Sequence, residues 1–193
     1  MSAAVHHELI LGGQKSGKTV RAERAVARWL EQGAARRALY VATALPWDAE
    51  MQERIARHRQ DRALRVPRME TLQAAERGAP LDVPALLRRH AAPDTALVLD
   101  CLTLWLTQQL MPLEGAEVPA GDAAVADLLD SIQAWPGPLY IVSNEIGLGV
   151  IPLGRETRAF VDALGELNQR VAAVCSHVTL MAAGLPLNLK SSD

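Results

Sequence analysis

Short apolar runs alternate along this chain with longer segments whose apolar residues recur at the spacing of a helix. The apolar runs predict strands over residues 9–11, 38–42, 96–99, 139–142 and 178–181, with weaker candidates at 66–69 and 185–189. The amphipathic segments predict helices over residues 20–32, 48–59, 80–90, 102–111, 122–135 and 155–175. Residues 112–121, rich in Pro, Gly and Glu, are predicted to form a mobile loop.

This alternation of strands and helices predicts the fold class. It indicates one α/β domain over residues 1–193, with a doubly wound, mainly parallel sheet and an antiparallel edge strand. The sequence shows no internal repeat and no linker between domains. Ligands of such folds bind beyond the carboxyl ends of the strands. The residues that directly follow each strand are therefore the candidates for a functional site.

The segment between the first strand and the first helix matches the phosphate-binding loop (P-loop) pattern Gly-x₄-Gly-Lys-Thr. Glycines let successive backbone N–H groups point at phosphate oxygens, and a helix N-terminus adds partial positive charge. Lys18 is expected to reach the β- and γ-phosphates, and the Thr19 hydroxyl to bind Mg²⁺. The alternative is a glycine-rich turn before an ordinary surface helix, but the flanking strand and helix favour a nucleoside triphosphate site. The expected contacts are Gly12, Gly13, Gln14, Lys15, Ser16, Gly17, Lys18 and Thr19.

Polar residues also follow two later strands. Asp100 ends the apolar run 96–99, where a carboxylate is the usual partner of a phosphate-binding loop because it holds Mg²⁺ directly or through water. The alternative for Asp100 is an N-cap of the helix that starts at residue 102; the phosphate-binding loop favours the metal role. The run Ser143-Asn144-Glu145 is as compatible with helix capping as with a function.

One histidine stands apart from the others. His58 has four arginines within four residues on either side, and such a segment repels itself unless anions are near. The residues alone slightly favour a solvated helix face for this segment; the alternative is that His58 is a nucleophile towards phosphorus. The remaining histidines are expected to be structural, with His6 and His7 exposed before the first strand. His90 and His177 lie at the ends of predicted elements.

Length, net charge and the distribution of apolar residues limit the classes of protein to which this chain can belong. The 193 residues suffice for one sizeable core, and the net charge of −2 gives no basic surface for nucleic acid. No apolar run reaches membrane-spanning length, and the N-terminus lacks the features of a secretory signal, so a cytoplasmic protein is expected. Cys101 and Cys175 lie far apart in apolar surroundings and are predicted to be buried thiols.

Five segments together resemble a known family. They occur in the order GGQKSGKT, WDAEMQERIARHRQDR, LVLDCLTLWL, VSNEIGLGVIP and LNQRVAAV followed by AAGLPLNLK. They are similar to the bifunctional adenosylcobinamide kinase / adenosylcobinamide-phosphate guanylyltransferase family of cobalamin biosynthesis, over residues 9–190. Many NTPases share the phosphate-binding loop, whereas the His58 segment and VSNEIGLG are far more specific. The resemblance implies a RecA-like P-loop fold, usually assembled as a homotrimer.

The resemblance also implies two reactions and a set of site residues. ATP or GTP phosphorylates the hydroxyl of the aminopropanol arm of adenosylcobinamide, and GMP from GTP is then joined to that phosphate through a GMP–histidine intermediate. The histidine matches His58, and Lys18 joins it as a catalytic residue. The nucleotide contacts match residues 12–19, Ala42, Thr43, Ala44, Arg59, Gln60, Asp61, Arg62, Glu70 and Asp100, with Thr19 and Asp100 as the metal ligands.

The sequence departs from the family pattern at three places. Lys15 stands where the loop often has Arg, Asp100 where some members have Glu, and Pro152-Leu153-Gly154 where Pro-Glu-Asn is common. Two other functions stay open at this point. One is a monofunctional P-loop kinase for a different small molecule, with His58 merely solvated. The other is a non-catalytic nucleotide-dependent switch built on the same loop.

Overall fold

The structure, a computed structural model, describes residues 5–46, 48–73, 82–112 and 121–191. Its strands are β1 (His7–Gly12), β2 (Arg37–Ala42), β3 (Met69–Gln73), β4 (Thr95–Asp100), β5 (Leu139–Val142), β6 (His177–Ala182) and β7 (Leu185–Lys190). Its helices are α1 (Lys18–Glu31), α2 (Ala49–Arg65), α3 (Val83–His90), α4 (Leu102–Leu110), α5 (Gly121–Ala134) and α6 (Arg155–Val174). None of these helices is long and apolar enough to cross a membrane.

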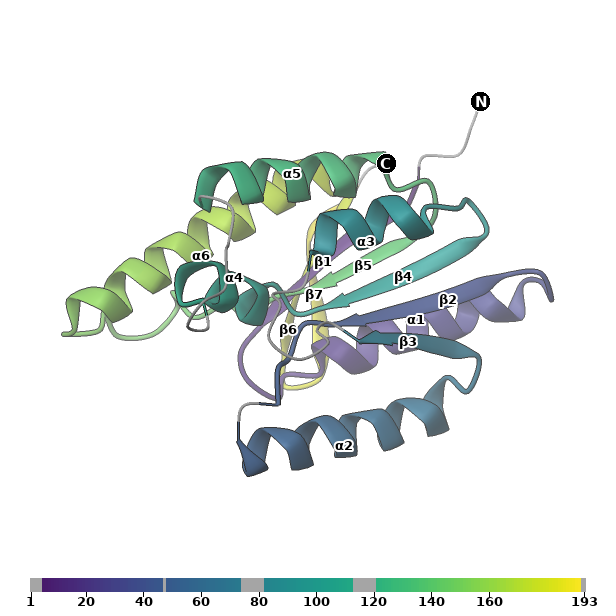
Figure 1. Cartoon of the computed structure of the whole chain (residues 1–193), viewed down its shortest axis with the longest axis horizontal. Coiled ribbons are helices and arrows are strands. Elements are labelled where there is room, and N and C mark those ends of the chain that lie inside the picture. Colours follow the sequence, from purple (N-terminus) through teal and green to yellow (C-terminus); the bar gives the residue numbers. More distant parts are fainter. Residues whose placement is uncertain (1–4, 47, 74–81, 113–120, 192–193) are drawn as a thin grey trace.

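The seven described strands form one sheet in the order β3-β2-β4-β5-β1-β6-β7 (Figure 1). All neighbouring pairs are parallel except β6 and β7, which are antiparallel. The expected α/β class with a mainly parallel sheet and an antiparallel edge strand is therefore confirmed. Because β1, β2, β4 and β5 run in the same direction, their carboxyl ends meet at one edge of the sheet.

Alternate residues of the central strands supply two separate cores. On β1, Leu9 and Leu11 pack with apolar side chains of α3, α4, α5 and α6, whereas Ile10 packs with those of α1. The same alternation holds on β4, where Leu97 and Val98 belong to different cores. Figure 1 shows the corresponding layers, with α1 and α2 on one face of the sheet and α3 and α5 on the other. Strands buried on both faces explain why their sequences read as continuous apolar runs.

The helix predicted over 48–59 and the strand predicted over 66–69 differ most from the structure in their bounds. The helix predicted over 48–59 continues to Arg65 as α2, because ion pairs and hydrogen bonds rather than an apolar stripe anchor its last two turns. The strand predicted over 66–69 is β3, displaced to Met69–Gln73, since Val66 caps α2 and accepts a turn hydrogen bond from the Met69 N–H. Asp82 caps α3 through the Ala85 N–H at 2.9 Å. Residues 80–81 and 113–120 of the predicted helix and loop lie outside the described part of the chain.

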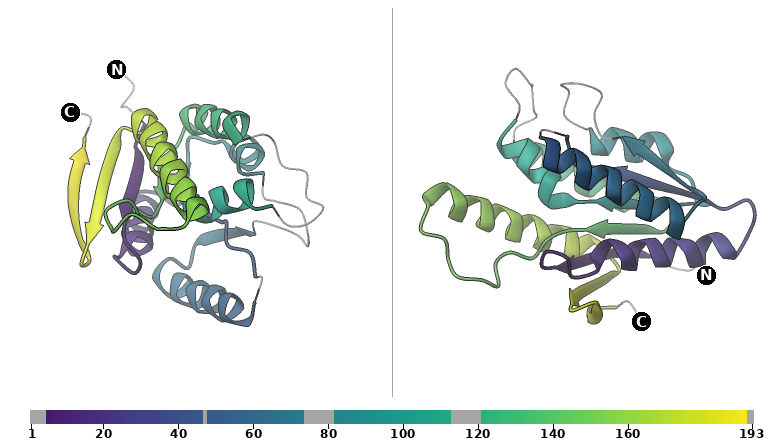
Figure 2. Two further views of the ribbon diagram at one scale, coloured as in Figure 1. Left: turned by 90° about the vertical axis from the view of Figure 1, so that its left-hand side faces the viewer. Right: turned by 90° about the horizontal axis from the view of Figure 1, so that it is seen from below.

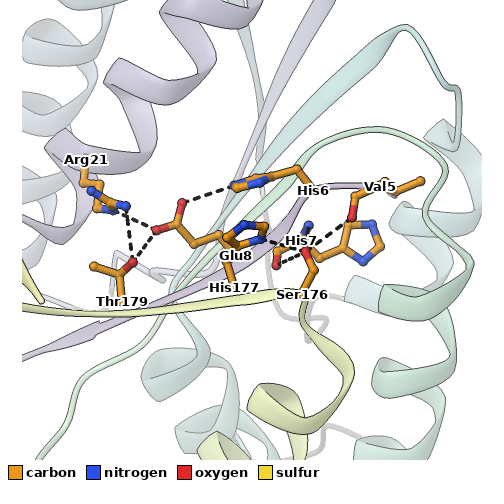
Figure 3. A network of polar contacts seen from close by, with 8 residues as sticks. All are labelled: Val5, His6, His7, Glu8, Arg21, Ser176, His177 and Thr179. Atoms are coloured by element: carbon orange, nitrogen blue, oxygen red, sulfur yellow. Dashed lines mark hydrogen bonds and ion pairs between the residues drawn. The ribbon is translucent and has the colours of Figure 1, made fainter. Parts of the chain in front are cut away.

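The expectation that His6 and His7 are both freely exposed was wrong. The chain enters β1 at His7, whose buried ring Nε2 lies 3.0 Å from the Trp135 carbonyl oxygen. His6 Nε2 lies 3.4 Å from Glu8 Oε2, and its ring centroid is 4.1 Å from that of His177 (Figure 3). The structural role expected for these histidines is thus a polar network at the beginning of β1, far along the strand from the phosphate-binding loop. Both cysteines are buried free thiols, as predicted.

Candidate active site

The loop between β1 and α1 requires glycine at two positions. A Cβ on Gly12 would lie 2.5 Å from the Met181 carbonyl oxygen, and φ is 149° at Gly12 and 100° at Gly17. Both φ values lie in a region that side chains with a Cβ rarely adopt. The Gly184 N–H donates to the Ser16 carbonyl at 3.1 Å, so the β6–β7 turn supports the loop from outside. The backbone thus curls tightly at the carboxyl end of β1, as a phosphate-binding loop must.

The Lys18 side chain turns back onto the backbone of this loop. Lys18 begins α1 and is buried, and its Nζ donates to the carbonyl oxygens of Gly12 at 2.9 Å and Gly13 at 2.7 Å. Burial lowers the pKa of Lys18, the Asp100 carboxylate opposes this, and the Arg54 guanidinium adds to it. The Lys18 ammonium therefore lies in a partly desolvated position where it would be a strong partner for a phosphate.

The structure brings Thr19 and Asp100 together. Thr19 Oγ1 donates to Asp100 Oδ2 at 2.9 Å, joining the first turn of α1 to the end of β4. Tyr40 Oη donates to the same Oδ2 at 2.5 Å. Asp100 does not cap α4, whose N-cap is Cys101 without a side-chain hydrogen bond. The capping alternative for Asp100 therefore has no support in the geometry.

This pair has the donor chemistry of a magnesium site. A hydroxyl and a carboxylate are oxygen ligands, which Mg²⁺ prefers, and Mg²⁺ usually takes few protein ligands beside phosphates and water. No group of three or more His, Cys, Asp or Glu side chains that could hold a metal ion occurs among the described residues. The residues present thus fit an ion shared with a nucleotide rather than one enclosed by protein alone.

The helix α2 approaches the phosphate-binding loop through Arg54. When the Gln14 amide is oriented with its oxygen towards Arg54, Gln14 Oε1 accepts from Arg54 Nη2 at 2.8 Å and from Nη1 at 3.1 Å. His58 lies four residues further along α2 and therefore on the same face as Arg54. The contact turns the face of α2 that carries His58 towards the phosphate-binding loop.

A second contact fixes the same face one turn after His58. Arg62 is the one buried side chain among the described residues of α2, and its Cζ lies 3.7 Å from the centroid of the Tyr40 ring. Arg62 Nη2 also donates to Thr71 Oγ1 at 3.1 Å. His58 is thus bracketed by Arg54 at the loop and by Arg62 at the tyrosine that holds Asp100.

The environment of His58 favours the neutral imidazole. Partial desolvation lowers the pKa of His58 even though the residue is exposed, and the guanidinium groups of Arg54 and Arg62 act in the same direction. The carboxylates of Asp100 and Asp61 oppose them. A neutral ring among cations has the lone pair that a nucleophile needs and neighbours that would stabilise negative charge on phosphorus.

The sequence matches a family model described as cobinamide kinase / cobinamide phosphate guanyltransferase over residues 8–189. The chain belongs to this family. The bifunctional adenosylcobalamin biosynthesis protein CobP of Pseudomonas aeruginosa is 43% identical over 183 residues, covering 95% of this chain and 96% of the relative. The corresponding protein CobU of Salmonella typhimurium is 33% identical over 192 residues, covering 94% and 98%. Relatives of this cobinamide kinase / guanyltransferase family are thus matched over nearly their whole length.

A solved structure supports the fold of this family member. The flagellar accessory protein FlaH of Methanocaldococcus jannaschii superposes with a TM-score of 0.55 over 97% of this chain and 79% of FlaH. Its sequence identity is 12%, so the likeness concerns the fold alone. The expected P-loop architecture is confirmed at this level.

Of the other residues that the resemblance implies as nucleotide contacts, some lie at the carboxyl edge of the sheet and others do not. Ala42, Thr43 and Ala44 follow β2 at the carboxyl edge, but the fully buried Thr43 hydroxyl is engaged by Cys101. Asp61 pairs with Arg65 at 3.4 Å. Arg59 and Gln60 are exposed and follow His58 directly, so they point away from the Arg54–His58–Arg62 face.

Glu70 is not brought to the phosphate-binding loop. It lies near the start of β3 in register with Leu39, which is the opposite end of the strand from the carboxyl edge. Its carboxylate is 3.8 Å from Arg37 Nη2 in an exposed ion pair. In this conformation Glu70 is therefore separated from Thr19 and Asp100.

Two contributors to the site escaped the sequence analysis. Tyr40 lies inside an apolar strand, and its hydroxyl was the one available signal that this position meets a polar partner. In the sequence Arg54 is only one of the charges around His58, because its contact with Gln14 depends on how α2 packs. Both are contacts between elements, so local sequence patterns cannot assign them.

Proposed function

We propose that this protein phosphorylates adenosylcobinamide with ATP or GTP and then transfers GMP from GTP to the resulting phosphate. The family match gives the reaction class. The observation that carries the assignment to residues is the contact between Gln14 and Arg54, because it turns the His58 face of α2 towards the phosphate-binding loop. A kinase alone needs the loop; a guanylyltransferase with a histidine intermediate needs both features together.

The first reaction uses the loop and Asp100. Phosphoryl transfer depends on positioning and charge neutralisation rather than on a protein nucleophile. The loop N–H groups and Lys18 would bind the β- and γ-phosphates, and Thr19 and Asp100 would hold Mg²⁺, which neutralises charge on the triphosphate. The acceptor hydroxyl oxygen then forms a bond to the γ-phosphorus as the bond to the β-phosphate oxygen breaks; the nucleoside diphosphate leaves with the electron pair of that bond, and the hydroxyl proton passes to solvent.

The second reaction proceeds as two displacements. A neutral ring nitrogen of His58 attacks the α-phosphorus of GTP, an N–P bond forms, and pyrophosphate leaves with the electron pair of the broken P–O bond. The phosphate oxygen of the acceptor then attacks the same phosphorus, and the N–P bond breaks to return neutral His58. Arg54 and Arg62, on either side of His58, would stabilise the charge that develops on phosphorus.

The remaining parts of the proposal rest on the family. Mg²⁺, a homotrimeric assembly and a cytoplasmic location accompany the enzyme activity. The residues at positions 12–19, with Ala42, Ala44 and Asp100, are the nucleotide contacts that the geometry supports best. Arg59, Gln60 and Glu70 would reach a nucleotide only after a change in the position of α2 or β3.

The proposal is tested by following the corrinoid through both steps. The protein is incubated with adenosylcobinamide, GTP and Mg²⁺, and the corrinoids are separated by chromatography over time. We expect a phosphorylated intermediate followed by a GDP-linked product, and neither with the Lys18→Ala variant. Accumulation of the phosphate alone would indicate the monofunctional kinase with a solvated His58. No corrinoid product at all would refute the substrate assignment.

A further inference from the structure

The segment that follows β5 lies between the two halves of the nucleotide site. In the sheet β5 separates β1, which carries the phosphate-binding loop, from β4, which ends on Asp100. The Glu145 N–H donates to the Gly12 carbonyl at 3.1 Å, and the Asn144 N–H donates to Thr103 Oγ1 at 3.0 Å. The chain that continues from this segment towards solvent thus begins beside the place where the phosphates of a nucleotide would bind.

Buried polar atoms without a partner gather at the base of this segment. Ser143 is fully buried, and no hydrogen-bond partner for its Oγ exists among the described residues. Asn168, on α6, donates to the Asn144 carbonyl at 3.1 Å, but its Oδ1 is likewise buried and unpartnered within the described chain. Native proteins satisfy nearly all such groups, so two of them at one edge indicate that a ligand or water completes the set.

Beyond this polar base the segment becomes apolar and exposed. Leu148, Val150, Ile151 and Leu153 are each at least 76% exposed. In Figure 2 the chain between β5 and α6 (green) runs outward beyond the carboxyl ends of the strands before α6 begins. Four exposed apolar side chains in one short segment that starts at the catalytic edge are typical of a binding surface rather than of ordinary protein surface.

From these observations we infer that residues 143–153 form the docking surface for the corrin ring of the acceptor, an inference that rests on the proposed function. The acceptor must place its hydroxyl or phosphate arm at the nucleotide phosphates, which Gly12 and Asp100 flank on either side of β5. A corrin is a large ring with apolar faces and amide side chains. The apolar residues would cover a ring face, and Ser143 and Asn168, buried without the acceptor, would reach polar groups of the arm after a change in side-chain position.

The test compares a triple variant and a double variant, each of which replaces exposed apolar side chains by serine. Leu148→Ser combined with Val150→Ser and Ile151→Ser alters the inferred docking surface; Leu187→Ser combined with Leu189→Ser alters exposed apolar side chains on β7. For the first variant we expect KM for adenosylcobinamide to rise about tenfold or more, because several apolar contacts are lost. The KM for GTP and covalent labelling by [α-³²P]GTP should stay at the wild-type level, and the β7 variant should leave all three unchanged.

Two outcomes would overturn the inference while leaving the proposed function intact. One is an unchanged KM for adenosylcobinamide in the triple variant at Leu148, Val150 and Ile151. The other is a loss of acceptor binding that accompanies a change in molecular mass measured by sedimentation, which would make the segment an interface between copies of this chain. If wild-type protein does not act on adenosylcobinamide, the proposed function fails first.

Ser143→Ala provides a second measurement. A hydroxyl without a protein partner contributes little to stability, so the unfolding midpoint should not fall. If the hydroxyl binds the acceptor arm, KM for adenosylcobinamide should rise while KM for GTP does not. An unchanged KM for adenosylcobinamide would remove Ser143 from the inferred surface, and a lower unfolding midpoint would show a structural role for its hydroxyl.

Discussion

Thr19 and Asp100 are 81 positions apart in the chain and are joined by a hydrogen bond of 2.9 Å. The bond connects the first turn of α1 to the end of β4 across the intervening strand β5. It brings the hydroxyl of the phosphate-binding loop and the strand-end carboxylate to one point, which is the arrangement that a nucleotide-bound Mg²⁺ requires.

Lys18→Ala should severely reduce both activities, because both reactions hold the triphosphate in the same loop. Loss of one or two charge-assisted hydrogen bonds to phosphate should cost about 2–4 kcal/mol of transition-state stabilisation. The measurement is kcat/KM for phosphorylation and for guanylyl transfer. Lys15→Ala is the matched control, since Lys15 is exposed on the same loop and should cost less. Wild-type kcat/KM in the Lys18 variant would contradict the assignment.

Asp100→Asn should impair Mg²⁺ use more than folding. The amide oxygen can still accept from Thr19 and Tyr40, but the charge that attracts the cation is removed. Activity titrated against Mg²⁺ should shift to higher concentrations while Tm changes little. A titration curve that coincides with that of the wild type would show that Asp100 does not ligate the ion.

Tyr40→Phe should act through Asp100, because the lost hydroxyl donates to the same Oδ2 as Thr19. The Asp100 carboxylate would be held less firmly, so the Mg²⁺ titration should shift in the same direction as for Asp100→Asn, by a smaller amount. The stability cost should be about 1 kcal/mol, the usual value for one hydrogen bond. Tyr140→Phe, the same chemical change on β5, should leave the titration unchanged. Equal effects of the two variants would point to a general loss of packing.

Glu8 should make stability depend on pH at the acidic end. Burial alone would raise the pKa of Glu8, but hydrogen bonds from His6, Thr179 and Arg21 and the charge of Arg21 lower it to about 2 (Figure 3). A folded pKa below the unfolded value of 4.5 means that the stabilisation is present above pH 4.5 and is lost as pH falls towards 2.

The stability difference between wild type and Glu8→Gln should therefore be constant near neutral pH and should shrink below about pH 4.5. Denaturant unfolding at several pH values measures it. Asp127→Asn is the control, because Asp127 pairs with Arg88 on the surface and its loss should matter little. A difference that does not change between pH 6 and pH 3 would contradict the low pKa of Glu8.

The sequence predicts those parts of the candidate site that depend on a local pattern of residues. The phosphate-binding loop needs glycines at fixed positions and a strand and helix around it, and Asp100 ends an apolar run, so the sequence predicts the place of both in the fold. The roles of Tyr40 and Arg54 depend on how α2 and β2 pack against other elements, which no local pattern records. The end of α2 was missed for the same reason, since Arg62 and Arg65 anchor it through Tyr40 and Glu23.

The pH dependence of GMP labelling should report the lowered pKa of His58. Only the neutral ring attacks, so labelling should persist below the ordinary histidine pKa of 6.5 and fall when the pH drops through the lower value. Arg54→Ala removes a cation that lowers this pKa, so its profile should shift to higher pH. Arg57→Ala is the matched control within α2. Coincident profiles for the two variants would show that Arg54 does not influence the ring.

The most direct test of the account is covalent labelling of wild type and His58→Ala by [α-³²P]GTP with Mg²⁺, followed by mapping of the labelled peptide. The account predicts one labelled site at His58 in the wild type, cleaved by acid and stable to base as a phosphoramidate. It predicts no label and no guanylyl transfer in His58→Ala, with kinase activity retained at least in part because that step needs no protein nucleophile. Covalent GMP in His58→Ala, or transfer at the wild-type rate, would contradict it.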